Sequence, residues 1–257
     1  TMTFATAAEA VQHIVTTEDM FALEETDIRG VSFRTFKNAP RHLGEILALT
    51  KEYDGLEFLV FEDERYTYEE FREQTYRLSQ ALIHEAGLKK GDRVAIAMRN
   101  YPEYLMLMMA ISAAGGVIVF LNSWWTTDEM EYGFTDSQAK LAFVDAQRSA
   151  AMQPFAEKMS IRRIMVRDAT TEGTTAFSDL MAASPSSEAP AVEIHTDDDM
   201  AVMYTSGSTG HPKGVVQTHR GAISAVLSWL MGGRLAEVMG TAPEPPLGDD
   251  GEPLQVC

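Results

Sequence analysis

The sequence has almost no cysteine: Cys257 is the only one in 257 residues. A single thiol excludes an internal disulfide and any zinc site built from several cysteines. The N-terminal end carries acidic residues and lacks the basic-then-apolar start of a secretory signal. These features predict a cytoplasmic protein in a reducing compartment, and they leave peripheral association with a membrane open.

Long hydrophobic runs are also missing. The longest, Leu105 to Leu121, is interrupted by the pair Gly115-Gly116. It is too short and too broken for a transmembrane helix, and it predicts a buried helix followed by a buried strand.

Basic residues are scarce. Lysine and arginine total 21 against 38 aspartates and glutamates, which gives a formal net charge of −17. A general nucleic-acid surface requires clustered cations and is therefore excluded as a partner. An anionic ligand requires a local site, built from backbone N–H groups and one or two cations.

The apolar content of 45% is sufficient for a sizeable core. Residues 1–45 are weakly periodic, and short apolar strands alternate with amphipathic helices after them. This alternation predicts an α/β fold with parallel sheets flanked by helices on both faces and ligands beyond the carboxyl ends of the strands. Strands are expected near residues 57–61, 93–98, 117–121, 140–145 and 162–166, and helices near 67–86, 102–114 and 128–136.

Several local signals fix the expected helix ends and faces. Thr67 to Glu70 reads as a capping box, and the following helix places Phe71, Thr75, Leu78 and Leu82 on one face. Asn100 is the predicted cap of the next helix. Pro154 weakens the prediction of a helix between the strands at 140–145 and 162–166.

The stretch Tyr204 to Val216, YTSGSTGHPKGVV, combines glycines, hydroxyl residues and one lysine. Strands are expected on both sides, and then a helix with Ile223, Val226, Leu227 and Leu230 on one face. Glycines allow successive N–H groups to turn toward one anion, and Lys213 adds a compact charge. The stretch therefore predicts a polyphosphate-binding loop, with a flexible surface hairpin as the alternative. Pro212 before the lysine and Gly214 after it exclude a Walker A loop.

Further segments complete the expected organisation. Residues 183–193 form a loop rich in proline, serine and alanine, which suggests a boundary. We expect an N-terminal extension at 1–45, an α/β subdomain at 46–190, and a truncated second lobe carrying the phosphate loop at 191–257. Leu254 to Cys257 resembles the start of a strand, which favours a fragment of a longer protein.

The string YTSGSTGHPKGVVQTHR resembles the signature of the adenylate-forming (AMP-binding) superfamily. YTYEEF, MAVMYTSGSTG and the segment from Gly91 to Asp145 are similar to other blocks of this family in the same order. The likeness covers roughly Glu57 to Trp229 and is greatest to bacterial acyl-CoA synthetases that act on fatty acids. It implies the N-terminal region of the adenylate-forming fold, with the C-terminal lid absent.

The resemblance also implies a reaction and a site. A carboxylic acid, most simply a fatty acid, would attack ATP to form an acyl-adenylate, and the thiol of coenzyme A would then form a thioester, with Mg²⁺ assisting. Lys213 would reach the β- or γ-phosphate, and Thr205 would contact both the phosphates and the metal. The remaining phosphate-binding residues would be Ser206, Gly207, Ser208, Thr209 and Gly210.

Because the family's downstream blocks are absent, no catalytic residue is expected in this chain and the isolated fragment is expected to be inactive. Two alternatives stay open: a non-catalytic nucleotide-binding or interaction module, and adenylation for a different thiol acceptor. The expected partner is a small carboxylic acid, and homodimer formation is left open.

Other features favour structural roles. His211 and His219 lack a metal-ligand pattern, and His219 is expected at the start of the last helix. Trp124 and Trp125 are expected to pack at a junction between a strand and a helix, and Asp197 to Asp199 are expected to form a solvated turn.

Overall fold

The computed structural model describes residues 4–205 and 211–244, so the strand predicted at Leu254 to Cys257 lies outside the described residues. The chain divides into two compact units. One consists of residues 1–39 together with 222–257, and the other of residues 40–221. The domain boundaries expected from the sequence near residues 45 and 190 stay predictions.

The first unit contains elements that the weak periodicity of residues 1–45 did not predict. These are α1 (Ala7–Thr17), the 3₁₀ helix η1 (Asp19–Phe21) and the antiparallel strands β1 (Leu23–Ile28) and β2 (Val31–Phe36). The strands meet at Arg29 and Gly30, whose positive φ angles of 54° and 82° suit a two-residue hairpin turn. Helix α8 (His219–Val238) contributes most of its length to this unit, and its Arg234 pairs with Glu18 at 2.9 Å.

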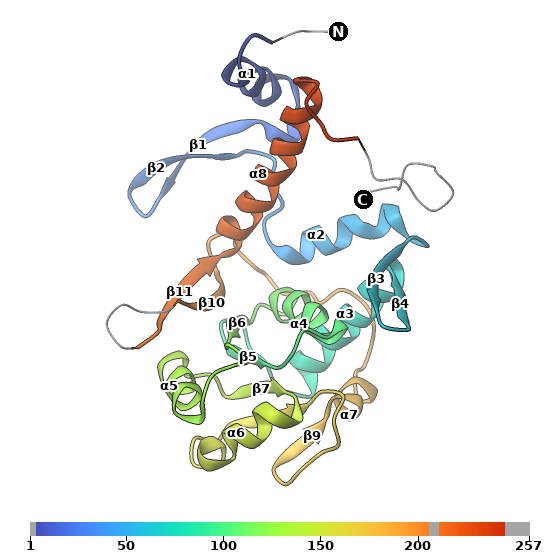
Figure 1. The fold of residues 1–257 in the computed structure, drawn as a ribbon, viewed down its shortest axis with the longest axis vertical. Coiled ribbons are helices and arrows are strands. Elements are labelled where there is room, and N and C mark those ends of the chain that lie inside the picture. The colour runs from blue at the N-terminus through green and yellow to red at the C-terminus, as the bar shows by residue number, and fades with distance from the viewer. Residues whose placement is uncertain (1–3, 206–210, 245–257) are drawn as a thin grey trace. The chain divides into compact units, whose positions relative to one another are not determined.

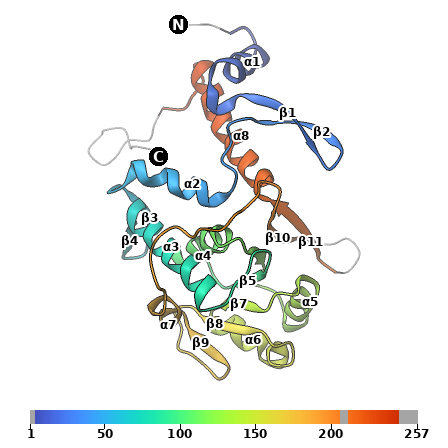
Figure 2. The same ribbon diagram turned by 180° about the vertical axis from the view of Figure 1, so that it is seen from behind.

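A seven-stranded sheet forms the centre of the second unit (Figure 1). Its order is β11-β10-β6-β5-β7-β8-β9, and every neighbouring pair is parallel except β10 with β11. The strands are β5 (Arg93–Ala97), β6 (Val117–Phe120), β7 (Leu141–Val144), β8 (Arg162–Met165), β9 (Thr174–Ala176), β10 (Asp199–Thr205) and β11 (Lys213–Thr218). Figure 2 shows β8 between β7 and β9.

Helices cover both faces of this sheet. Helices α3 (Tyr68–His84) and α4 (Pro102–Ala113) lie on one face, and α5 (Thr127–Ser137) and α6 (Ala146–Ala156) lie on the other (Figure 1). In β5, Ala95 and Ala97 join Met130, Phe134 and Phe155 from α5 and α6 in one buried cluster. Since side chains alternate along a strand, the equally buried Val94 and Ile96 face the opposite layer. The predicted α/β architecture is confirmed.

Smaller elements complete this unit. They are α2 (Leu43–Leu49), the 3₁₀ helix η2 (Thr50–Tyr53), the antiparallel hairpin of β3 (Glu57–Phe61) and β4 (Glu64–Thr67), and α7 (Phe177–Ala182). No element occupies residues 183–198, in agreement with the predicted loop.

The predicted capping box is confirmed. Thr67 Oγ1 accepts from the Glu70 N–H at 3.2 Å, and Glu70 Oε2 accepts from the Thr67 N–H at 2.9 Å. The predicted apolar face is also confirmed, because Phe71, Thr75, Leu78 and Leu82 are all buried.

Two local predictions need correction. Tyr101, not Asn100, is the N-cap of α4, and it makes no side-chain capping hydrogen bond. Pro102 disfavours a helical conformation at the residue before it, so Tyr101 stays extended and the helix starts at Pro102. In α8, Ile223 and Leu227 are buried but Leu230 is 52% exposed, so the predicted apolar face is buried only along its first turns.

Pro154 does not prevent helix α6, which extends to Ala156. The proline removes one backbone donor, and it lies so close to the end of α6 that only two helical residues follow it. Among residues 4–205 and 211–244, no helix is both long enough and apolar enough to cross a membrane.

Candidate functional site

The predicted phosphate loop connects the last two strands of the sheet. Thr205 ends β10 and pairs with Lys213, the first residue of β11. Both residues are exposed, and Thr205 Oγ1 makes a long contact of 3.5 Å with the Lys213 carbonyl oxygen. The other predicted phosphate ligands, Ser206, Gly207, Ser208, Thr209 and Gly210, lie outside the described residues, and their role stays a prediction.

Helix α5 holds both stems of this hairpin. The Tyr132 hydroxyl donates to the Pro212 carbonyl oxygen at 3.0 Å, and its ring stacks on His211 with centroids 4.9 Å apart. On the other stem, the Tyr204 hydroxyl donates to Asp136 Oδ2 at 2.8 Å. Burial is the largest cause that raises the pKa of Tyr204, and the hydrogen bond to the Asp136 carboxylate is the next. The phenol therefore stays protonated and keeps donating its hydrogen bond. The loop therefore begins and ends at fixed points.

Close packing also explains one glycine of the motif. A Cβ added at Gly214 would lie 2.9 Å from Val202 Cγ1 on the paired strand and 3.4 Å from the Tyr204 ring. A larger residue would require the Val202 side chain or the strand backbone to shift.

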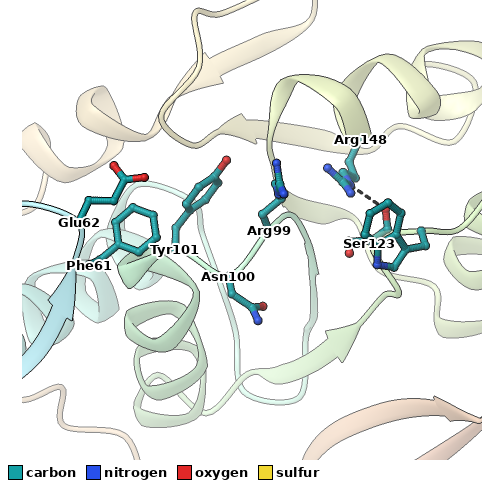
Figure 3. Close-up of a pocket in the computed structure, with 8 residues that line it drawn as sticks. Phe61, Glu62, Arg99, Asn100, Tyr101, Ser123 and Arg148 are labelled. Carbon is teal, nitrogen blue, oxygen red and sulfur yellow. Dashed lines mark hydrogen bonds between the residues drawn. The ribbon is translucent and has the colours of Figure 1, made fainter.

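The same edge of the sheet carries a cavity of about 560 Å³ (Figure 3). Because β10, β6, β5 and β7 run parallel, their carboxyl ends lie on one edge, together with the hairpin stems. The chain leaves β5 toward α4 on one face and leaves β7 toward α6 on the other, so the cavity lies at a topological switch point. Its lining residues are Phe61, Glu62, Arg99, Asn100, Tyr101, Ser123, Trp124 and Arg148.

The lining combines aromatic faces with guanidinium groups. In Figure 3, Phe61 and Tyr101 lie at one end, with ring centroids 5.9 Å apart, and Arg148 lies at the other. Arg148 is buried, with Nε donating to the Ser123 carbonyl oxygen at 2.8 Å and Nη1 to Asp145 Oδ2 at 3.1 Å. Arg99 is exposed, and no hydrogen bond or ion pair of its side chain occurs within the described part of the chain. Such a surface suits an aromatic or anionic group.

Comparison with known proteins identifies the family. A family model described as AMP-binding enzyme matches residues 48–243. The chain belongs to this family.

Curated relatives include ligases for two kinds of acid. The chain is 34% identical over 170 residues to the long-chain-fatty-acid–CoA ligase FadD13 of Mycobacterium tuberculosis, covering 65% of this chain and 32% of that protein. It is 32% identical over 163 residues to 4-coumarate–CoA ligase 1 of Petroselinum crispum, which covers 63% of this chain and 29% of that protein. The chain thus spans about a third of the length of these relatives.

Solved structures of this family confirm the fold. The inhibitor-bound N-terminal domain of FACL13 from Mycobacterium tuberculosis matches with a TM-score of 0.66 and 28% identity, over 75% of this chain and 48% of that one. ATP-bound MatB from Rhodopseudomonas palustris matches with a TM-score of 0.65 and 26% identity. This match covers 75% of this chain and 38% of the MatB chain.

Beside the cavity, Arg167 forms a clamp that the sequence did not predict. Its guanidinium carbon lies 5.1 Å from the Phe61 ring centre and 5.2 Å from that of Tyr101. The same group donates to both carboxylate oxygens of Glu64, at 2.6 and 2.9 Å, and to Glu103 at 2.8 Å. The hydrogen bonds from Arg167, and then from Tyr66, lower the pKa of Glu64 to about 2.

The two adjacent tryptophans separate. Trp125 packs against the core cluster and meets the Tyr204 ring edge-on, with centroids 5.3 Å apart, as predicted. Trp124 is 80% exposed and lines the cavity, so the prediction of packing is wrong for this residue. Ser123 and Trp124 lie in a turn that the Trp125 N–H closes by donating to the Asn122 carbonyl oxygen at 3.1 Å, and only Trp125 reaches the core from this turn.

The histidines and acidic residues take structural positions. His219 starts α8, as predicted, and is 1% exposed, while Asp198 forms an ion pair with Lys90 at 2.7 Å. The described residues contain no group of three or more histidine, cysteine, aspartate or glutamate side chains placed to hold a metal ion.

Proposed function

We propose that this chain is the nucleotide-binding part of an ATP-dependent acid–thiol ligase. The enzyme would convert a carboxylic acid into an acyl-adenylate and transfer the acyl group to the thiol of coenzyme A. The family match over residues 48–243, which includes the β10–β11 hairpin, is the observation that carries this proposal.

The described residues at the loop ends fit a nucleotide phosphate with its metal. Lys213 is exposed and forms no ion pair within residues 4–205 and 211–244, so its ammonium group is available to a β- or γ-phosphate oxygen. The exposed hydroxyl of Thr205, opposite Lys213 on the paired strand, is a candidate Mg²⁺ ligand. When bound, Mg²⁺ would neutralise charge on the phosphate oxygens.

The protein would contribute mainly by positioning. Negative charge grows on the phosphoryl oxygens during adenylation, and fixed donors stabilise it without reorganising. Tyr132 and Tyr204 fix the stems of the hairpin through Pro212 and Asp136. The donors of residues 206–210 would therefore extend from an anchored base.

The preferred substrate is proposed to be a fatty acid, with an aromatic acid as the second candidate. Relatives named for long-chain fatty acids and for 4-coumarate are 34% and 32% identical to this chain, so likeness alone does not separate the two. We further propose a cytoplasmic location and a small-molecule acid as the partner.

Acid-dependent exchange of labelled pyrophosphate into ATP tests the adenylation step. The protein encoded by the whole reading frame is assayed with fatty acids of increasing length, 4-coumarate and anthranilate. Exchange with fatty acids supports the full proposal, and exchange with aromatic acids alone replaces the fatty acid as substrate. Absence of exchange with every acid overturns adenylation.

Two further measurements separate the alternatives. Incubation of the acyl-adenylate with either coenzyme A or a carrier-protein thiol identifies the acceptor. The 257-residue chain alone is expected to bind ATP without supporting exchange; exchange by this chain would show that the predicted inactivity is wrong.

A further inference from the structure

A second cavity, of about 350 Å³, lies at the edge of the sheet opposite the candidate site. It lies at the amino ends of three neighbouring strands. Arg93 is the first residue of β5, Arg162 is the first residue of β8, and Lys140 directly precedes β7. All three basic residues line the cavity.

The strand register places these cations around the amino edge of the sheet. Val94 of β5 pairs with Leu141 of β7, and Leu141 pairs in turn with Arg162 of β8. Arg93 and Lys140 each precede a paired residue by one position, whereas Arg162 is itself a paired residue. Because side chains alternate along a strand, Arg93 and Lys140 leave one face of the sheet and Arg162 leaves the other, so the three positive charges lie on both sides of the edge where these strands begin.

No carboxylate neutralises these cations through an ion pair within the described residues. Lys140 Nζ donates to the Met159 carbonyl oxygen at 2.8 Å, and Arg162 Nη1 donates to the Glu85 carbonyl oxygen at 3.3 Å. The side chain of Arg93 has no hydrogen bond or ion pair in this part of the chain. Asp92 is the one acid in the lining, and its Oδ2 accepts from the Lys89 N–H at 2.8 Å.

The overall charge makes this cluster unusual. Three cations face one carboxylate here, in a chain whose formal net charge is −17. Among the described residues, most other arginines form ion pairs with carboxylates, as Arg72 does with Asp54 and Arg148 with Asp145. The cavity is therefore a local positive site on an acidic protein.

Part of the wall is bare backbone. Gly87 and Gly91 both line the cavity with positive φ angles of 72° and 85°. A Cβ added at either residue would meet no atom within 4 Å. The basic residues therefore share the cavity with two glycines that have no side chain to fill it, which leaves room for a ligand.

We propose that this cavity binds a linear polyphosphate group of a small molecule. Neighbouring strands lie about 4.8 Å apart, so the backbones of β5 and β8 lie about 10 Å apart with β7 between them. A chain of two or three phosphates can therefore contact more of the three cations at once than a single orthophosphate can. Planar guanidinium groups bind phosphate oxygens in pairs, and the lysine adds a point charge.

This site is separate from the predicted phosphate loop. The loop follows the carboxyl end of β10, whereas the cavity lies at the amino ends of strands in the same largely parallel sheet. The inference therefore holds or fails independently of the proposed ligase activity.

Titration with inorganic tripolyphosphate, without Mg²⁺ and followed by the backbone amide NMR signals of the chain, tests this inference. The signals of Gly87 and Gly91 report on this cavity even if tripolyphosphate also binds the loop. We expect both signals to shift, and we expect orthophosphate to bind at least about tenfold more weakly because it reaches fewer cations. No shift of either signal, or equal affinity for the two anions, would overturn the proposal.

Variants give a second test of the same inference. Arg93→Gln removes a side chain that has no hydrogen bond or ion pair among the described residues, so this variant should fold normally. Adding Arg162→Gln should weaken tripolyphosphate binding at Gly87 and Gly91 by about tenfold or more. The control Lys51→Gln/Arg65→Gln removes the same charge from exposed residues that do not line the cavity. An equal loss in both double variants would show general charge attraction and contradict a specific site.

Discussion

At the scale of single residues, Arg167 connects segments distant in the sequence. It follows β8 by two positions, yet it contacts Phe61, Glu64 and Tyr101. Its φ angle of 67° lies in the left-handed region, which costs free energy in a residue other than glycine. The ion pairs and ring contacts offset that cost, and they hold two aromatic walls of the cavity in place.

Replacing Arg167 should therefore destabilise the unit formed by residues 40–221. Arg167→Met removes the ion pairs with Glu64 and Glu103, and we expect the free energy of unfolding to fall by roughly 2 kcal/mol. Arg167→Lys is the matched control, which keeps the charge but loses the paired hydrogen bonds to Glu64. In urea denaturation, the wild type should have the highest free energy of unfolding, Arg167→Lys an intermediate one and Arg167→Met the lowest. A lysine variant as stable as the wild type would show that charge alone is sufficient.

Lys213 should contribute to ligand binding rather than to folding. It is exposed, and within residues 4–205 and 211–244 its side chain forms no ion pair. We expect Lys213→Ala to weaken ATP binding by about tenfold or more, because a charged hydrogen bond to phosphate is lost. The unfolding free energy should change by less than about 0.5 kcal/mol. Calorimetric titration with ATP measures the first effect, with Lys51→Ala as the control. Equal ATP affinity in Lys213→Ala and the wild type would refute the assigned role.

At the scale of elements, the capping box at Thr67 gives a quantitative test. Thr67→Ala removes the hydroxyl that accepts from the Glu70 N–H at the start of α3. We expect a loss of about 1 kcal/mol in unfolding free energy, and Thr67→Ser should retain most of the stability. Chemical denaturation of both variants checks the prediction. Similar losses in the serine and alanine variants would mean that the methyl group, not the cap, is important.

Local chemistry explains which elements the sequence predicted well. Capping residues, buried apolar runs and glycine pairs act over a few neighbouring residues, so α3, β5 and β6 lie close to their expected positions. The hairpin of β1 and β2 was not predicted, because most of its residues are exposed and apolar residues do not alternate regularly with polar ones along its strands.

The candidate site was predicted unevenly for the same reason. The glycines and the lysine of the predicted phosphate loop are adjacent in the sequence, so a local pattern is sufficient to predict a role for them, and that role stays a prediction. The cavity draws on segments near residues 61, 100, 123 and 148, and Arg167 lies farther along the chain. Residues such as Arg148 and Trp124 gain their positions only after the sheet has formed, and a single sequence does not predict that convergence.

At the scale of the whole molecule, the sheet separates the two proposed anion sites. Its carboxyl edge carries the hairpin of the predicted phosphate loop, and its amino edge carries the cavity with Arg93, Lys140 and Arg162. Since the chain has a net charge of −17, both sites require local cations that overcome the surrounding negative potential. Binding at either site should therefore depend on those few residues.

The stability of the protein should decrease in mild acid because of His219. This side chain is 1% exposed, and its Nδ1 accepts from the Leu43 N–H at 3.4 Å. Burial lowers the pKa of His219 to about 4; nearby His42 and Lys90 also lower it, and Asp198 partly opposes them. The unfolded chain, with its histidine pKa near 6.5, then binds more protons than the folded one. Stability from neutral His219 is thus fully present above pH 6.5 and is lost as the pH falls toward about 4.

Urea denaturation at several pH values between 7 and 4.5 measures this loss. We expect His219 to contribute on the order of 2 kcal/mol to the decrease in unfolding free energy over this range. His219→Phe should be less stable at pH 7 and less sensitive to pH, because the variant has no imidazole to protonate there. His42, whose pKa burial also lowers, should leave some pH dependence in the variant. His195→Phe changes an exposed histidine and should keep the wild-type profile. If His219→Phe has the same slope against pH as the wild type, protonation of this buried histidine does not limit stability in acid.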